Sequence, residues 1–184
     1  MSVDVVGGAA GLAPAARLLA MWWSPPDPGE LDRWAGCWEA AGDVAGELRA
    51  AVDDALREEY ERLFVGPGRP PCPPYESMWL TDQPRREQGR LMAACAADVA
   101  RIYGELGLQV RADAHELPDH VVVELEALAY ALEHGAAEAA HALAVDHLAV
   151  WMPSFCAAVG AETEHPFYAA LARLTPDWVA ALSA

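Results

Sequence analysis

Residues 60–80 read Tyr-Glu-Arg-Leu-Phe-Val-Gly-Pro-Gly-Arg-Pro-Pro-Cys-Pro-Pro-Tyr-Glu-Ser-Met-Trp-Leu and join a helical pattern to a loop rich in glycine and proline. The helical pattern ends at Phe64 and Val65. Five prolines follow by position 74, and they fix φ and disfavour helix at the residues before them. We therefore expect a stiff, extended loop that is suited to gripping a partner. The far end of this loop carries Tyr75, Ser77 and Trp79.

The rest of the chain has a helical composition. Ala, Leu, Glu and Arg are abundant among the 184 residues, and apolar residues recur at helical spacing. We predict an all-α fold, a single-domain helical bundle of about eight helices spanning residues 1–184, because no linker is long enough to divide it. The expected helices lie at about 12–23, 30–41, 44–64, 84–106, 118–135, 136–159, 166–174 and 176–182, and the sixth is kinked or interrupted near Pro153.

The charge of the chain limits its partners. The formal net charge is -16, and all 12 basic residues are arginine. Binding to nucleic acid needs clustered cations that neutralise phosphates, and this sequence has no such cluster. Strong acidity also disfavours anionic membranes and favours solubility or a basic partner. We expect no nucleic-acid partner.

Two features predict a cytoplasmic protein. The apolar stretch from Val5 to Trp23 is preceded by Asp4 rather than by basic residues, and Pro14 and Arg17 interrupt it. This pattern predicts an amphipathic first helix and no stable membrane insertion. The second feature is the scattered cysteines without a Cys-x-x-Cys pair, which favour reduced thiols: Cys37, Cys72, Cys95 and Cys156.

Motifs for catalysis are weak. The sequence has no phosphate-binding loop with its lysine and no serine nucleophile elbow. Glu138 and His141 form one Glu-x-x-His element, but a carboxylate-bridged metal site needs two such elements and two further helical glutamates. We predict no catalytic residue and no metal. A small helical di-iron or manganese carboxylate metalloenzyme, built around this pair and His147, is the alternative.

Three polar residues near one predicted helix start have two interpretations. His120 and Glu124 lie four apart on one helical face, and Asp119 stands beside the helix start. In the first interpretation, Asp119 caps the helix and the other two form a surface pair worth about 0.2–0.5 kcal/mol. Alternatively, the three residues form a polar cluster at the rim of a groove. Elsewhere, we predict that His147 is a core histidine bonded to a neighbour and that Trp79 is partly exposed.

Several blocks of sequence, in this order, resemble one known family. The first two blocks are Tyr60-x-x-Leu63-Phe64-Val65-Gly66-Pro67-Gly68 and Pro73-Pro74-Tyr75-Glu76-Ser77-Met78-Trp79. The next is Glu116-x-Pro118-Asp119-His120-x-x-x-Glu124-Leu125. The last two are His147-Leu148-x-x-Trp151-x-Pro153-x-Phe155 and His165-Pro166-Phe167-Tyr168-x-Ala170-Leu171. These blocks are similar to those of the TorD/DmsD family of redox-enzyme maturation chaperones.

The resemblance implies an all-helical chaperone with no cofactor and no catalytic activity. Such proteins bind the twin-arginine (Tat) signal peptide, and in some cases the mature part, of a molybdopterin oxidoreductase. They hold this precursor in the cytoplasm until its molybdenum cofactor is inserted. The sequence leaves open which oxidoreductase is the client, whether the chain is a monomer or a homodimer, and whether it is an adaptor for a different peptide.

Carried over by position, the leader-binding region of the family corresponds to Tyr75, Ser77, Trp79, Asp119 and His120. Glu124 completes the predicted signal-peptide site, because it lies one helical turn from His120. We expect Asp119 to pair with the leader's arginines and Trp79 to contact its apolar stretch.

Overall fold

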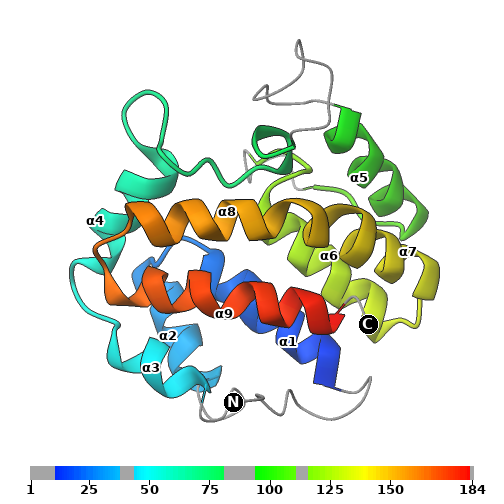
Figure 1. Ribbon diagram of the computed structural model, residues 1–184. Coiled ribbons are helices and arrows are strands. Elements are labelled where there is room, and N and C mark those ends of the chain that lie inside the picture. The colour runs from blue at the N-terminus through cyan, green and yellow to red at the C-terminus, as the bar shows by residue number, and fades with distance from the viewer. Residues whose placement is uncertain (1–10, 38–43, 81–93, 111–115, 183–184) are drawn as a thin grey trace.

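The computed structural model describes residues 11–37, 44–80, 94–110 and 116–182, and this part of the chain is helical (Figure 1). The α-helices are α1 (Leu12–Trp23), α2 (Pro28–Cys37), α3 (Val44–Ala50), α4 (Leu56–Tyr60), α5 (Ala94–Glu105), α6 (Val121–Glu133), α7 (Ala137–His141), α8 (Ala149–Glu162) and α9 (Pro166–Leu182). Two π-helices and a 3₁₀ turn complete the described elements: η2 (Glu61–Val65), η4 (Ala142–Leu148) and η3 (Glu76–Met78). The predicted all-α fold is confirmed.

Two helix pairs form the frame of the molecule. The first pair is α8 and α9, which run antiparallel side by side, and the second is α1 packed against α6 (Figure 1). The proline-rich loop leaves η2 and runs along α8 toward α5 (Figure 1). It therefore lies where segments from the middle and the end of the chain meet.

Aromatic side chains fill the space between these helices. The ring of Trp23 on α1 lies 5.0 Å from that of Phe155 on α8, measured between centroids, and its indole N–H donates to Thr175 Oγ1 at 3.2 Å. Trp34 stacks on Phe167 at 5.3 Å. Each such side chain contributes about 1.5–3 kcal/mol by leaving water, and an aromatic pair adds roughly 0.5–1.5 kcal/mol.

The predicted helix over 44–64 is wrong in its middle. The chain leaves the helix after Ala50 and re-enters it at Leu56. Asp53 explains the break: its Oδ1 accepts the N–H of Ala55 at 2.9 Å and lies 3.0 Å from His165 Nε2. A side chain that bonds its own nearby backbone competes with helix, and here it also holds a distant segment.

Proline interrupts the C-terminal helices less than predicted. The expected helices 166–174 and 176–182 form one helix, α9, which continues through Pro176. Pro176 has no N–H to donate, and the hydroxyl of Thr175 donates to Leu171 O at 2.7 Å one residue earlier. The sixth helix likewise runs through Pro153 without a break, and its irregular part is the π-helix η4 before it.

Parts of two predicted helices, 30–41 and 84–106, lie outside the described residues, as do Trp38 and Leu91. One continuous helical stretch, Ala137–Glu162, is long and apolar enough to cross a membrane by length and composition, with a mean hydropathy of 1.5. Half of the apolar window in this stretch is buried inside the fold.

Candidate functional site

The proline-rich loop has two halves that differ in burial. The entrance half (Val65–Pro71) starts with a turn at Gly66, whose φ of 45° favours glycine, and most of its side chains are exposed. The exit half (Cys72–Trp79) begins with three buried residues. The side chain of Cys72 is fully buried, and its N–H donates to Leu63 O at 3.0 Å.

The exit half is bonded to the start of α6 through the backbone. Tyr75 and His120 form an isolated antiparallel β-bridge. On one side of the bridge the N–H of Val121 donates to Pro74 O at 3.0 Å. On the other side the N–H of Glu76 donates to Asp119 O at 2.9 Å. These bonds fix the position of the loop relative to α6.

The Asp119 side chain reinforces this attachment. Its Oδ2 accepts the N–H of Ser77 at 3.1 Å, and the carboxylate is fully buried. Neither Asp119 Oδ1 nor the hydroxyl of Ser77 has a hydrogen-bond partner among the described residues. Asp119 therefore holds the 3₁₀ turn η3 in place, and a partner's arginine has no access to it in this structure.

The interpretation of Asp119 as the helix cap is wrong, because His120 is the cap. His120 Nδ1 accepts the N–H of Val122 at 3.2 Å. Burial lowers the pKa of His120, although the charges of Glu116 and Asp119 act in the opposite direction. A neutral imidazole can accept this hydrogen bond, whereas a protonated one cannot.

Two aromatic side chains of the exit half reach the surface. Trp79 is partly exposed, as predicted; its indole N–H donates to Pro73 O at 2.7 Å. Tyr75 is also partly exposed, and its hydroxyl donates to Glu116 Oε2 at 3.0 Å. The side chain of Glu116 is 37% exposed. These residues present an aromatic surface with a carboxylate at its edge.

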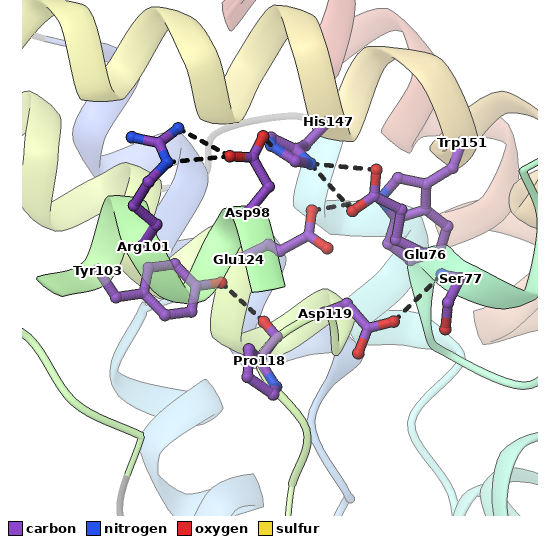
Figure 2. A network of polar contacts seen from close by, with 10 residues as sticks. All are labelled: Glu76, Ser77, Asp98, Arg101, Tyr103, Pro118, Asp119, Glu124, His147 and Trp151. Atoms are coloured by element: carbon purple, nitrogen blue, oxygen red, sulfur yellow. Dashed lines mark hydrogen bonds and ion pairs between the residues drawn. The ribbon is translucent and has the colours of Figure 1, made fainter. Parts of the chain in front are cut away.

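A network of polar contacts joins η3 to η4, α5 and α6 (Figure 2). Glu76 is 1% exposed, and its Oε2 and Oε1 lie 3.0 and 3.1 Å from Nδ1 of His147. The indole N–H of Trp151 donates to Glu124 Oε2 at 3.2 Å. Burial, and then the nearby charge of Glu76, raise the pKa of Glu124 well above its ordinary value, so we expect a protonated carboxyl at neutral pH.

His147 bridges two carboxylates. Its Nε2 lies 3.4 Å from Asp98 Oδ2, within ion-pair distance but without a hydrogen bond among the described residues, and Asp98 pairs with Arg101 at 2.7 Å on the same helix, α5. Burial on its own would lower the pKa of His147, but the hydrogen bond and charge of Glu76, together with Asp98, outweigh it and raise the pKa. The prediction of a core histidine bonded to a neighbour is confirmed.

The six residues predicted for the site lie where the exit half of the loop contacts α6, but they differ in accessibility. Tyr75 and Trp79 are half-buried, whereas the other four are buried: Ser77, Asp119, His120 and Glu124. The sequence did not single out Glu76 and Glu116. Both stand inside the family-like blocks, next to Tyr75 and two residues before Pro118, and this position was the available signal.

The residues of the alternative metal site are not gathered together. Glu138 and His141 are exposed on α7, while His147 points to Glu76 in the interior. In the part of the chain that the structure describes, no group of three or more His, Cys, Asp or Glu is placed to hold a metal ion. The contacts of the network hold the exit half of the loop against η4 and the start of α6.

The entrance half borders a groove of about 770 Å³. Apolar surface comes from Pro26, Val65 and Pro67, and Val65 is 57% exposed. Charged residues of both signs line the same groove: Asp27, Glu58, Glu61, Arg57 and Arg62. Asp27 and Glu61 pair with Arg57, so the exposed apolar side chains are what the groove offers to a peptide.

The chain is similar to several known proteins. The model of the nitrate reductase delta subunit family matches residues 29–157. A Tat proofreading chaperone DmsD from Salmonella typhi is 31% identical over 188 residues, which cover 92% of this chain and 90% of that protein. A chaperone protein TorD from Shewanella pealeana is 30% identical over 141 residues, covering 74% of this chain and 64% of that protein.

A solved structure supports the same fold. The crystal structure of a candidate redox enzyme maturation protein from Archaeoglobus fulgidus matches with a TM-score of 0.71. The alignment covers 98% of this chain and 99% of that one at 24% sequence identity.

Proposed function

Because this chain belongs to the TorD/DmsD family of redox-enzyme maturation chaperones, we propose that it binds the Tat signal peptide of a molybdopterin oxidoreductase. The proposed chaperone works in the cytoplasm, without a cofactor or catalytic activity of its own. It retains the precursor until the molybdenum cofactor has been inserted. The relative from Salmonella typhi carries the same kind of function in its name, Tat proofreading chaperone.

One observation carries this proposal. Tyr75 and Trp79 are half-exposed on a backbone that is held by bonds to the start of α6. A preorganised surface loses little conformational entropy on binding, which favours recognition of a flexible peptide. The net charge of -16 favours a basic partner and would speed its association.

We assign different roles to the exposed and the buried residues of the site. Tyr75 and Trp79 contact the apolar part of the leader. Glu116, at the edge of the aromatic surface, pairs with a leader arginine. The buried residues keep this surface in place: Ser77, Asp119, His120 and Glu124.

Titration of a synthetic peptide tests the assignment. The probe carries two adjacent arginines followed by an apolar stretch, and isothermal calorimetry measures its affinity. Trp79→Ala is expected to weaken binding by about 2 kcal/mol, the size typical of an interface hot spot. Glu116→Gln is expected to weaken it by about 1 kcal/mol, as for a partly exposed ion pair.

Glu138→Gln is the matched control for Glu116→Gln, because Glu138 is an exposed carboxylate on α7 and lies outside the site. It should leave affinity unchanged. A peptide in which both arginines are replaced by glutamine controls for the apolar contribution. Equal affinity of the wild type and Trp79→Ala would remove the exit half from the binding surface.

Capture from the native host tests the client. The tagged chain is purified from its host, and bound proteins are identified by mass spectrometry. The expected partner is a precursor of a molybdopterin oxidoreductase that still carries its leader. Consistent recovery of a different protein, with no such precursor, would identify the chain as a helical adaptor for another peptide.

A further inference from the structure

Glu76, His147 and Asp98 come from three separate parts of the chain and meet inside the fold. Glu76 belongs to η3 at the exit half of the loop, Asp98 to α5, and His147 to the π-helix η4 (Figure 2). His147 is 4% exposed, whereas the side chain of Asp98 is 50% exposed. The imidazole therefore links an interior carboxylate to one at the surface.

We propose that Glu76, His147 and Asp98 form a latch that holds the exit half of the loop on η4 and α5 more tightly when His147 carries a proton than when its imidazole is neutral. In this arrangement His147 is a positioning residue for Tyr75 and Trp79, which flank Glu76 in the same turn. The consequence for leader binding rests on the function proposed above. The latch itself does not, because it concerns the chain alone.

The geometry favours a protonated imidazole. A carboxylate faces each ring nitrogen, Glu76 at 3.0 Å on Nδ1 and Asp98 at 3.4 Å on Nε2. Only the imidazolium offers a donor on both nitrogens, since a neutral ring has one N–H and one lone pair. Losing the proton therefore removes one of the two contacts and leaves two carboxylates next to a neutral ring.

The other charged groups around the network are either paired, buried beside Glu76 or exposed at the surface. Arg101 on α5 pairs with Asp98, and Glu124 on α6 lies near Glu76, with its pKa raised by burial and by the charge of Glu76. The charged residues of α9, which also contacts η4, are exposed at its surface: Arg173 and Asp177. On the same helical stretch as His147, the neighbouring charged residues are also exposed: Glu138, His141 and Asp146.

The sign of the pH dependence follows from the raised pKa of His147, whose ordinary value is 6.5. The stabilisation is complete below about pH 6.5 and is lost as the pH rises through the raised value. Alkaline conditions should therefore loosen the exit half. A fall in pH should tighten it until other groups, such as buried His120, take up protons.

Hydrogen exchange of the whole chain tests the latch without any ligand. Protection of the amides of Glu76, Ser77 and Trp79, corrected for intrinsic exchange rates, is measured by mass spectrometry from about pH 6 to about pH 9. We expect protection of this segment to fall by about tenfold over the range, the size of a hydrogen bond to a charged group. Amides in the middle of α6 serve as the internal reference.

Three variants identify the titrating group. His147→Asn keeps a neutral donor toward Glu76, so it should abolish the pH step. Asp98→Asn removes one of the two carboxylates and should move the midpoint to lower pH. Glu105→Gln removes the other partner of Arg101, 2.6 Å away, and should leave the midpoint unchanged.

The outcomes separate the latch from the proposed function. A flat protection profile in the wild type, or the same step in His147→Asn, overturns the latch. If the step is present but the affinity for the synthetic twin-arginine peptide does not follow it, the latch stands and its link to leader binding is wrong. Peptide affinity that falls together with protection supports both.

Discussion

Both halves of the proline-rich loop contain proline, but they differ in burial and in how they are attached to the rest of the fold. In the entrance half, Val65 is exposed and the backbone turns through glycines with positive φ. In the exit half, the carbonyl of Pro74 accepts the N–H of Val121, and the N–H of Glu76 donates to the carbonyl of Asp119. These two backbone bonds attach the loop to the start of α6. Proline occurs in both halves, so stiffness of the chain alone does not fix a loop in space. Bonds to a neighbouring element do, and among the described residues the backbone bonds that join this loop to α6 are made by the exit half.

Among the substitutions that test this difference between the halves, Asp119→Ala is expected to have the largest effect on stability. It would leave the buried N–H of Ser77 without an acceptor, which costs roughly 2–3 kcal/mol in the free energy of unfolding. Urea denaturation measures the loss. Asp119→Asn, which keeps an acceptor oxygen, should recover most of it. Similar stability of the Ala variant and the wild type would show that the exit half is held by its backbone bonds alone.

Glu124→Gln should increase the stability of the protein at alkaline pH, whereas Asp119→Ala decreases it. Because the folded pKa of Glu124 is raised above the ordinary 4.5, its contribution to stability is complete below about pH 4.5 and falls as the pH rises through the folded value. The amide cannot ionise, so we expect the variant to be roughly 1 kcal/mol more stable than the wild type at about pH 8.

Guanidinium denaturation of Glu124→Gln at about pH 5 and at about pH 8 makes this comparison. The two proteins should differ least at the lower pH. A gain of the same size at both values would instead indicate an effect of packing, unrelated to ionisation of the carboxyl.

Gly66→Ala tests the entrance half. The φ of 45° and ψ of 158° at Gly66 are unfavourable for residues with a Cβ, and the added atom would lie 3.6 Å from Pro70 Cα, which is an ordinary contact. The cost is therefore conformational, about 1 kcal/mol. We expect a lower thermal midpoint with unchanged exchange protection at Ser77. Loss of that protection as well would mean that the two halves move as one unit.

Val65→Ser should have the smallest effect on stability, within about 0.5 kcal/mol, because the side chain is 57% exposed. The informative measurement for this variant is its affinity for the peptide. If the groove beside the entrance half receives the apolar part of the leader, affinity for the twin-arginine peptide should fall while the fold is unaffected. Unchanged affinity would restrict recognition to the exit half.

The sequence predicted the helical fold well because helical periodicity is a local property. It failed where a distant residue decides the local structure. The break before Leu56 depends on Asp53, whose partner His165 lies more than a hundred residues further along the chain. Likewise, α9 continues through Pro176, where the proline alone predicted a boundary, and Thr175 beside it accepts the indole N–H of Trp23 on α1.

The candidate site shows the same limit. The family-like blocks led to residues that the fold does gather, including Tyr75 beside His120. Burial was not visible in the sequence, so Asp119 was expected to face the partner although it faces Ser77. The pairing of Glu76 with His147 spans 71 positions, and only the folded chain reveals it.

Cys72 lies where the entrance half meets the exit half, and the rate at which its thiol is modified can therefore be used to measure opening of the loop. Burial raises the pKa of its thiol to about 11, and the side chain is fully buried, so a thiol reagent can modify it only when the segment opens. The rate of its labelling therefore reports how often the exit half detaches. The labelling rate of partly exposed Cys37 serves as the reference in the same molecule, so no substitution has to be introduced.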